Sequence, residues 1–555
     1  MGGLRTALFN YLFARRHGGA FLLRIEDTDE ERRVEGSVES LLSTLQWCGL
    51  RHDEGPGVPG GSAGPYIQSQ RLPLYAEHAQ RLLEGGHAYR CFCTAERLGK
   101  LREYQASKGL APGYDGACRG IEPSASRARA AAGEACVVRL AVPLGASTAL
   151  EDLVLGEVRF SHTAVDDQVL LKSSGWPTYH LACVVDDHLM GVSHVIRGQE
   201  WLPSTPKHLL LYKALGWKPP AFAHLPLLLN ADKTKLSKRK GDAAVEDYAG
   251  AGFLPGALVN FVATLGWTPR EALSPTATLE DLARAFSLKD VHKANAVVDR
   301  HRLEWTNAQH VKAALAGGAA GAEAGAAAPL QQQRQSNAEE TRRLIREGAV
   351  AAVLPALVAL VGEEGAREAL GACSFEAVLV AQHERVGALS DFGPLLLPFL
   401  LRVAPQGVAG EEAFKRYLAS EAPASALKRI ASSMGASGAG EGAGTTGAGS
   451  SAGSEFCALE PRSVLHPALR ELLSDWTALA AGQGEAAASG DRAWGDKATR
   501  AVKAAAKRAG LPAGKLMLPL RWALTGLDAG TAFSDTLGLL GGAECCARLK
   551  VSLGL

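Results

Sequence analysis

The sequence is poor in the features that mark membrane-spanning, disulfide-stabilised and strongly basic proteins. It has no run approaching the roughly 18 apolar residues that a transmembrane helix needs, so we expect no membrane partner. Ten cysteines among 555 residues are too sparse for a disulfide scaffold, which favours a reducing compartment. The 59 Lys and Arg nearly balance 58 Asp and Glu, so any polyanionic partner must bind to local patches.

The pattern of apolar residues divides the chain into two halves. Up to about Tyr248, β-rich runs such as Phe21–Ile25, Gln168–Lys172 and His194–Gly198 alternate with helical patterns such as "RLPLYAEHAQRLLEGG", which is typical of an α/β fold. From Leu254 onward apolar residues recur at three and four residues, which predicts helices and almost no strands. The chain is too long for one core, so we expect several domains.

Three low-complexity stretches interrupt the helical half. They are Ala314–Ala328, Ser432–Ser454 and Ala480–Gly490, all rich in Gly, Ala or Ser. They contain too little large apolar surface to offset the entropy of ordering, so we interpret them as flexible insertions between helices.

A cationic stretch, "KTKLSKRKGD", follows the apolar run Phe222–Asn230 directly. It places five cations among its first eight positions, Lys233 to Lys240. A solvated surface loop is one interpretation, as for most charge runs. The other is a mobile loop beside a buried wall, which could bring point charges onto a triphosphate and follow the charge as pyrophosphate leaves.

Within this stretch, Lys235–Arg239 ("KLSKR") resembles the second signature of class I aminoacyl-tRNA synthetases. Four longer blocks resemble bacterial-type glutamyl-tRNA synthetases: Arg5–Asp29, Gly64–Tyr75, Pro177–His208 and Gly252–Trp267. They occur in order across the first 310 or so residues. Such a set is far more specific than one short motif.

The resemblance implies a Rossmann-like catalytic domain split by an insertion and followed by helical domains, that is, α/β and then all-α. The expected divisions are 1–84 with 160–248 for catalysis, 85–159 for an inserted domain that binds the tRNA acceptor end, 249–312 for a helical stem-contact domain, and 338–555 for anticodon binding. The implied activity is ATP-dependent conversion of L-glutamate to glutamyl-adenylate, with Mg²⁺, and transfer to the terminal adenosine of tRNA(Glu). Whether tRNA(Gln) is also charged stays open, and the protein is expected to be a monomer.

By the same resemblance, the cationic loop carries the nucleotide chemistry. Lys235, Ser237, Lys238 and Arg239 would be catalytic, and Lys235, Leu236 and Lys238 would bind ATP.

Glutamate carries two carboxylates and an ammonium group, so its pocket needs a buried cation and a carboxylate. Arg197 in "VIRGQE" and Glu26 in "RIEDTD" supply these types. From position alone, Arg197 could equally form a sheet-edge ion pair and Glu26 could be a solvated strand end. The resemblance implies that Arg197 binds the substrate side chain, that Glu26 binds its amino group, and that Tyr179 and Glu200 line the same pocket; the alternative for Tyr179 is an ordinary core residue.

Three cysteines in the expected insertion suggest a metal site. Cys91, Cys93 and Cys118 lie within one short segment, which favours tetrahedral Zn²⁺ but leaves one ligand missing. In zinc-bearing members of the family a tyrosine completes the site, and its place here is Tyr114. The alternative is three reduced cysteines with no metal.

The helical half resembles the family more faintly, in Glu384–Phe392 and Lys515–Gly526. The resemblance places Arg385 against the last anticodon base, where an arginine can make paired hydrogen bonds to a base edge. A routine surface arginine is the alternative.

The first residues depart from the family pattern, because "MGGLRTALF" starts as if within the histidine-bearing first signature. We therefore expect this form to be truncated and to activate glutamate poorly. A non-catalytic RNA-binding protein is one alternative, and a shorter relative that attaches glutamate to a queuosine base is another, although that relative lacks the helical half. Blocks such as "GQEWLPSTPKH" are similar to organellar members, so we expect a mitochondrial or plastid location, with the cytoplasm as the alternative.

Overall fold

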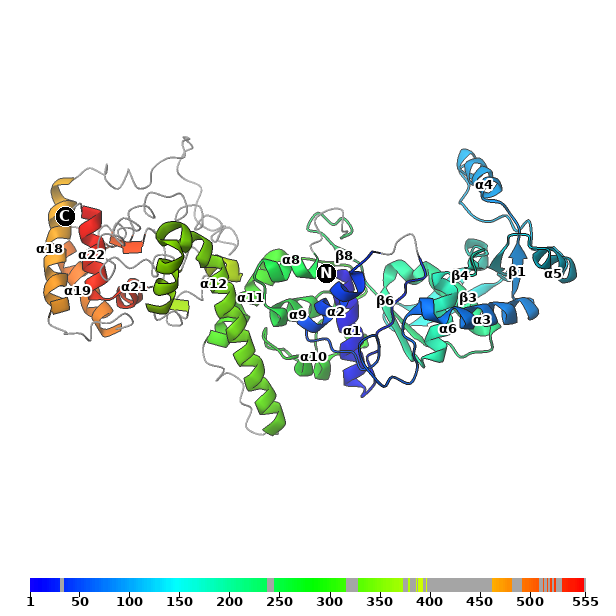
Figure 1. Cartoon of the computed structure of the whole chain (residues 1–555), viewed down its shortest axis with the longest axis horizontal. Helices are drawn as coiled ribbons and strands as arrows, with labels where there is room; N and C mark the ends of the chain where they lie inside the picture. The colour runs from blue at the N-terminus through cyan, green and yellow to red at the C-terminus, as the bar shows by residue number, and fades with distance from the viewer. Residues whose placement is uncertain are drawn as a thin grey trace. The chain divides into compact units, whose positions relative to one another are not determined.

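The computed structural model describes residues 1–29, 34–236, 244–315, 328–372, 462–481, 492–508 and 532–553, with short runs and single residues at 378–396 and 513–525. The chain forms two compact units (Figure 1), which are described separately. The first contains Met1–Val245 and Val259–Val298, and the second contains Glu246–Leu258 and Asp299–Leu555. Among the described helices, none combines the length and apolarity that crossing a membrane requires.

The first unit mixes helices and short strands along the chain. Its elements are α1 (Gly2–Arg16), α2 (Ser37–Trp47), η2 (Gln68–Arg71), α3 (Leu72–Glu84), β1 (Ala88–Cys91), α4 (Ala95–Ser107), α5 (Pro123–Ala131), β2 (Val137–Leu140), β3 (Ser147–Asp152), β4 (Gly156–Ser161), η3 (His162–Ala164), β5 (Val169–Leu171), α6 (Tyr179–Leu189), β6 (His194–Gly198), η4 (Gln199–Ser204), α7 (Thr205–Ala214), β7 (Ala221–Leu225), β8 (Leu228–Leu229), α10 (Leu279–Ala285), η6 (Leu288–Asp290) and β9 (Ala296–Val297). The α/β prediction for this part of the chain is confirmed.

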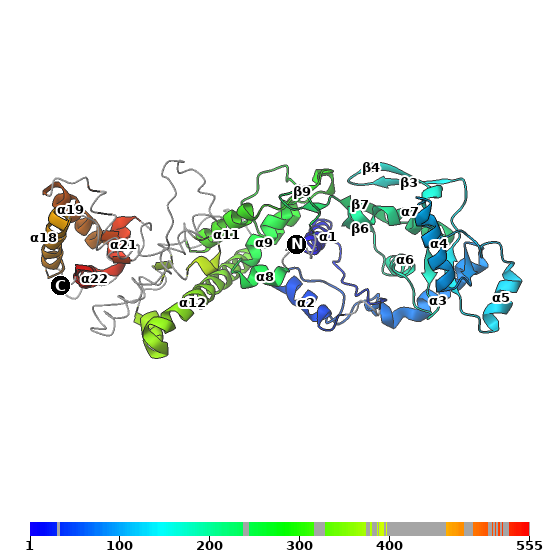
Figure 2. The same ribbon diagram turned by 90° about the horizontal axis from the view of Figure 1, so that it is seen from above.

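A four-stranded sheet with the order β4-β3-β7-β6 can be followed in Figure 2. Strands β6 and β7 are parallel, and their register pairs Arg197 with His224. Strand β3 runs parallel to β7, pairing Asp152 with Phe222, and antiparallel to β4. The carboxyl ends of β6 and β7 therefore lie at one edge of the sheet, where open α/β sheets bind ligands.

A second sheet, β1-β2-β5, is antiparallel and packs against helices. Apolar faces of α3, α6 and α7 meet it in a core that includes Tyr75, Leu140, Leu181 and Leu211, each at most 2 % exposed. The helix predicted within "RLPLYAEHAQRLLEGG" is confirmed as α3. It is amphipathic, since Tyr75, His78, Ala79 and Leu82 share its buried face.

The strand expected at Phe21–Ile25 is not formed as a continuous element. Leu22 and Ile25 each make one isolated bridge, to Glu54 and to Ile67. Because these partners come from two separate loop segments, no ladder continues between them. The segment is extended and hydrogen-bonded, as its β-rich composition suggested, but it is not a described strand.

The second unit is helical in the part of it that is described. Helices α8 (Val245–Gly250) and α9 (Pro255–Ala263) have residues in both units, and the remaining helices are α11 (Arg300–Leu315), α12 (Ala328–Ala372), η8 (Leu389–Asp391), α18 (Arg462–Ala481), α19 (Arg492–Arg508), α21 (Phe533–Leu540) and α22 (Gly542–Leu553). Its core contains aliphatic side chains, two cysteines and the aromatic residues Phe392, Phe533, Trp476 and Trp494. The low-complexity stretches fall mostly outside the described residues.

Candidate active site

An open cavity of about 2300 Å³ lies in the first unit, and six of the predicted site residues line it. These residues are Glu26, Tyr179, Arg197, Glu200, Lys235 and Leu236. They come from five places in the sequence and from loops, α6, β6 and η4. Their convergence on one cavity does not follow from any local spacing, so it supports a common ligand site.

Arg197 lies at the end of β6 and is only 7 % exposed. Each of its five N–H groups has an acceptor: Nε donates to Nε2 of His224 (3.1 Å), Nη1 to Oη of Tyr179 and Nδ1 of His208 (3.3 Å each), and Nη2 to the Trp201 carbonyl (3.3 Å) and Oγ1 of Thr205 (2.9 Å). In the described part of the chain, no carboxylate lies within ion-pair distance of this guanidinium. Its charge is therefore held by neutral acceptors.

Two histidines on the same side of Arg197 are kept uncharged. Burial, with the positive charges of Arg197 and its neighbours, holds the pKa of His208 well below its ordinary value. Burial followed by the charges of Lys207 and Arg197 lowers the pKa of His180 to about 4. The two rings are hydrogen-bonded at 3.1 Å. Neither ring adds charge at neutral pH, so Arg197 remains the cation of this group.

Tyr179 begins α6, and its ring lies against Trp201 with centroids 4.5 Å apart. Burial raises the pKa of its hydroxyl, so the group stays protonated and can both accept from Arg197 and donate to a ligand. Glu200 follows two residues after Gly198, and a Cβ at Gly198 would overlap the Glu200 carboxylate. The glycine thus lets the Glu200 side chain fold back over the strand end.

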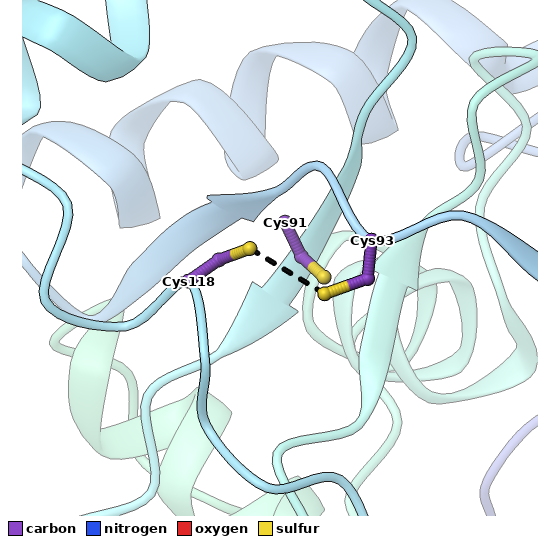
Figure 3. Close-up of side chains that lie close together, drawn as sticks. All are labelled: Cys91, Cys93 and Cys118. Carbon is purple, nitrogen blue, oxygen red and sulfur yellow. Dashed lines mark hydrogen bonds between the residues drawn. The ribbon is translucent and has the colours of Figure 1, made fainter. Parts of the chain in front are cut away.

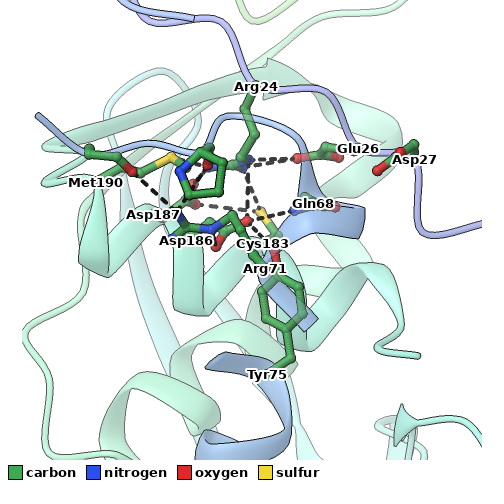
Figure 4. A network of polar contacts seen from close by, with 12 residues as sticks. Arg24, Glu26, Asp27, Gln68, Arg71, Tyr75, Cys183, Asp186, Asp187 and Met190 are labelled. Atoms are coloured by element: carbon green, nitrogen blue, oxygen red, sulfur yellow. Dashed lines mark hydrogen bonds and ion pairs between the residues drawn. The ribbon is translucent and has the colours of Figure 1, made fainter. Parts of the chain in front are cut away.

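Glu26 is joined to α6 through Arg24, as Figure 4 shows. Nη2 of Arg24 donates to Glu26 at 2.9 Å and Nη1 donates to Asp187 at 2.8 Å. The Glu26 side chain is 36 % exposed, whereas that of Asp187 is 9 % exposed. Arg24 thus fixes a carboxylate at the cavity surface by pairing with a second, buried one.

Below this pair, the Asp186 carboxylate is fully buried and has three donors (Figure 4). It accepts from Nε of Arg71 (2.7 Å), Nε2 of Gln68 (2.9 Å) and the hydroxyl of Tyr75 (2.8 Å). These contacts join η2 and α3 to α6. This network is not among the sites predicted from the sequence, although two adjacent acids within the apolar helix sequence "LACVVDDHLM" are a signal for it.

Lys235 and Leu236 follow a tight turn after β8. Lys233 adopts left-handed backbone geometry there, and its amide donates to the Asn230 carbonyl at 2.9 Å. The Leu236 amide then donates to the Leu228 carbonyl at 3.0 Å, so the chain returns along β8. Ser237, Lys238 and Arg239 lie outside the described residues, as does Arg385.

The three predicted cysteine ligands form a separate cluster (Figure 3). The Sγ atoms of Cys91, Cys93 and Cys118 all lie within 4.8 Å of one another. The Tyr114 hydroxyl is 3.3 Å from Cys91 Sγ and 3.5 Å from Cys93 Sγ. Burial raises the pKa of the Cys91 thiol, but its hydrogen bonds with Tyr114 and other neighbours outweigh this and lower the pKa overall.

This donor set fits a tetrahedral zinc ion. Cys93 Sγ and Cys118 Sγ are 3.6 Å apart, close to the roughly 3.8 Å between two thiolates that share one tetrahedral zinc at about 2.3 Å each. Four further cysteines are buried and lie outside this cluster: Cys48, Cys183, Cys545 and Cys546.

Comparison with known families agrees with this geometry. Residues 1–305 match the family described as tRNA synthetases class I (E and Q), catalytic domain, and residues 487–553 match an anticodon binding domain. The first match covers more than half of the 555 residues, so the chain belongs to the class I tRNA synthetases of the E and Q type. The predicted fold, a Rossmann-like catalytic domain with a helical anticodon domain, is confirmed.

The individual relatives that the chain resembles are glutamate–tRNA ligases. The chain is 48 % identical over 322 residues to a glutamate–tRNA ligase of Alkaliphilus metalliredigens (57 % of this chain and 65 % of the relative), and 51 % identical over 319 residues to one of Chlorobium phaeobacteroides (56 % and 63 %). These matches span just under two thirds of each relative. A solved glutamate tRNA ligase from Elizabethkingia meningosepticum, in complex with its amino acid, is similar with a TM-score of 0.70, 27 % identity, and coverage of 100 % of this chain and 96 % of that one.

Proposed function

We propose that this protein is a glutamate–tRNA ligase, which activates L-glutamate with ATP to glutamyl-adenylate and transfers the glutamyl group to the 3′-terminal adenosine of tRNA(Glu). Family membership and the relatives' names support this activity. One structural observation carries the choice of substrate: Arg197 is a buried guanidinium in the cavity wall, held by neutral groups. Such a cation retains its attraction for a ligand carboxylate.

The described residues supply complementary groups for each part of the substrate. The γ-carboxylate would pair with Arg197 by taking the N–H groups of Nη1 and Nη2 that now donate at 3.3 Å to the Tyr179 hydroxyl and the Trp201 carbonyl. Glu26 would accept hydrogen bonds from the ammonium group. Tyr179 would orient the side chain beside Arg197. Lys235 and Leu236 would face ATP, with Ser237, Lys238 and Arg239 completing the nucleotide contacts and Mg²⁺ accompanying the phosphates.

ATP–pyrophosphate exchange with L-glutamate, measured in the presence of tRNA, tests the activity. Replacing Arg197 with Gln removes the cation but keeps a polar side chain, so kcat/KM for glutamate should fall by about 10²-fold or more. Arg159→Gln is the matched control, because Arg159 lies on β4 of the same sheet, outside the cavity, and pairs with Glu157. Equal exchange by both variants would contradict the proposal.

The second part of the proposal concerns the tRNA. The match at residues 487–553 supports an anticodon-binding role and favours tRNA charging over the shorter queuosine-modifying relative. Aminoacylation of separated tRNA(Glu) and tRNA(Gln) decides whether one or both are substrates. We propose Arg385 as a contact of the last anticodon base, so Arg385→Ala should reduce the discrimination between the two tRNAs.

We also propose a structural zinc ion bound by Cys91, Cys93, Cys118 and Tyr114. Zinc content measured by plasma mass spectrometry should be near one ion per chain and should fall in Cys118→Ser. Cys136→Ser is the control, because Cys136 lies in the same region but outside the cluster. Unchanged zinc content in Cys118→Ser, or no zinc in the wild-type protein, would contradict the site.

A further inference from the structure

Two buried side chains, Asp152 and His224, form a hydrogen-bonded pair that contacts Arg197. Oδ2 of Asp152 and Nδ1 of His224 are 2.6 Å apart, and Nε2 of His224 accepts from Nε of Arg197 at 3.1 Å. Asp152 is 4 % exposed, and His224 is fully buried. A carboxylate, an imidazole and a guanidinium thus form one continuous chain of hydrogen bonds that ends at the cavity.

The sheet register brings these three side chains together. Arg197 on β6 is the direct partner of His224 on β7, and Asp152 on β3 pairs with Phe222, two residues before His224. Because side chains alternate between the two faces of a strand, His224 and Phe222 project to the same face. Asp152 and His224 are 72 residues apart in the chain, so only the parallel pairing of β3, β7 and β6 juxtaposes them.

The surroundings of Asp152 determine which nitrogen of His224 carries the proton. Oδ1 of Asp152 accepts the backbone amides of Val154 (2.9 Å) and Leu155 (2.8 Å), and Oδ2 faces the ring. The His224 backbone amide lies between the two oxygens, at 3.3 Å from Oδ1 and 3.2 Å from Oδ2. A carboxylate oxygen only accepts, so Nδ1 of His224 must be the protonated nitrogen and Nε2 must carry the lone pair. Nε2 can then accept from Arg197 and also from the Thr205 hydroxyl at 3.2 Å.

This arrangement orients Arg197 without neutralising it. Arg24 and Arg71 each contact carboxylates directly, at 2.8 and 2.7 Å. Arg197 instead reaches Asp152 only through an imidazole. A direct carboxylate partner would compete with a ligand carboxylate, whereas a neutral imidazole fixes the plane of the guanidinium and leaves its charge for the ligand.

We propose that Asp152 is a positioning residue for Arg197, acting through the His224 tautomer that it selects, so that the guanidinium is preoriented for the side-chain carboxylate of the substrate. This inference rests on the proposed function, which makes that carboxylate part of L-glutamate. It assigns a role in amino-acid recognition to β3, a strand within the segment that the sequence analysis assigned to the inserted domain.

Asp152→Asn is the sharpest test. The Val154 and Leu155 amides would hold the Asn carbonyl oxygen in the Oδ1 position, so the NH₂ group would face Nδ1 of His224 and donate to it. The proton would then move to Nε2 and oppose the N–H of Arg197, as in other Asp–His pairs where Asn imposes the wrong tautomer. Calorimetry with L-glutamate should give a Kd raised by about 10-fold to 100-fold.

Two comparisons separate positioning from a general loss of structure. The Kd of a non-hydrolysable ATP analogue should stay within about 2-fold, and the preference for L-glutamate over L-glutamine should fall. Asp167→Asn is the matched control, since Asp167 is also a buried carboxylate that accepts a backbone amide, from Val142 at 3.0 Å. The side-chain partners of Asp167 are Tyr89 and Arg119 instead of Arg197 or His224. Its preference for glutamate should be unchanged.

A double-mutant cycle tests the route of action. His224→Phe keeps a buried ring but cannot accept from Arg197, so it should weaken glutamate binding at least as much as Asp152→Asn. If Asp152 acts through His224, the double variant should bind glutamate no more weakly than His224→Phe alone. Far-ultraviolet circular dichroism will detect unfolding of either single variant. If Asp152→Asn unfolds, His224→Phe alone still tests whether the acceptor on Nε of Arg197 matters for glutamate binding, and retained binding in folded His224→Phe overturns the inference.

The outcomes are distinct. Wild-type protein that binds no L-glutamate overturns the proposed function, and this inference with it. Wild-type binding that is retained in folded Asp152→Asn overturns only the positioning role, as do additive effects in the cycle. Equal loss of glutamate preference in Asp152→Asn and Asp167→Asn would identify a general structural effect and also overturn it.

Discussion

The two units treat buried charge differently. In the first, Asp186 and Asp152 are at most 4 % exposed and each belongs to a network that reaches the cavity. The described core of the second consists of aliphatic and aromatic side chains and two cysteines, with Glu544–Arg548 as a fully buried ion pair on one helix. Burying an ion costs several kcal/mol before pairing, so a unit that buries several near one cavity retains them for what the cavity binds.

The difference also lies in what the networks connect. Asp186 links η2 and α3 to α6, and Asp152 links three strands. The Glu544–Arg548 pair lies within α22, four residues apart, and Nη1 of the arginine also donates to the Leu524 carbonyl at 2.7 Å. In the first unit these buried charges therefore link separate elements, whereas the Glu544–Arg548 ion pair of the second unit lies within one helix.

Removing Asp186 should produce the largest difference in stability between the two units. Asp186→Ala leaves Arg71 buried without its carboxylate, so the free energy of unfolding of the first unit should fall by about 3–5 kcal/mol. Hydrogen exchange followed by mass spectrometry, which reports each region separately, should show lost protection in α3 and α6. Protection in α18 and α19 should be unchanged; an equal loss there would mean that the two units do not differ in this way.

Low pH should produce the next largest difference, because it should destabilise the first unit more than the second. His180 has a pKa lowered to about 4, so the unfolded chain binds a proton between pH 6.5 and 4 that the folded chain does not. The free energy of unfolding should therefore be unaffected by His180 above about pH 6.5 and should fall by up to about 3 kcal/mol as the pH decreases toward 4. The exchange of first-unit peptides should follow this slope, and His180→Gln should reduce it.

The exposed histidine His87 is the control for the acid titration. His87→Gln should keep the wild-type slope of the first unit. A slope of the same size in peptides of α18 and α19 would show that the acid sensitivity is not specific to the buried groups around Arg197.

A site residue could be predicted from the sequence where its neighbours in the chain form a recognisable block. Arg197, Glu26 and Lys235 lie in continuous blocks that resemble one family, and they do line one cavity. Asp152 and His224 carry no such signal. Their contact depends on the parallel register of β3, β7 and β6, which the order of residues along the chain does not reveal.

The same reasoning explains why the strand prediction at Phe21–Ile25 was wrong. Phe21–Ile25 has the composition of a strand, but pairing depends on partners that lie elsewhere, and here these are single residues of two loops. Helix α3 was predicted correctly because its apolar periodicity is contained within its own 13 residues. Helices reflect local pattern, whereas strands and buried ionic contacts reflect long-range pairing.

Packing in the second unit can be tested at Gly495. A Cβ there would overlap the Ser534 carbonyl oxygen and lie 2.9 Å from the Gly538 amide, so α19 and α21 would have to separate. Gly495→Ala should lower stability by about 1–3 kcal/mol, despite the better helix propensity of alanine. Gly99→Ala in α4, where nothing lies within 4 Å, should instead stabilise its helix by about 0.5–1 kcal/mol.

The smallest loss of stability should come from a helix N-terminus that lies outside the cavity and outside the Asp186 and Asp152 networks. Thr278 caps α10 in the first unit: its hydroxyl accepts the Asp281 amide at 3.1 Å, and Asp281 accepts the Thr278 amide in return. Thr278→Ala should cost about 1 kcal/mol, as caps do generally, and Thr278→Ser should restore most of it. Chemical unfolding measures both. A loss approaching that of Asp186→Ala would mean that the first unit is sensitive everywhere, and that buried charge is not what distinguishes it.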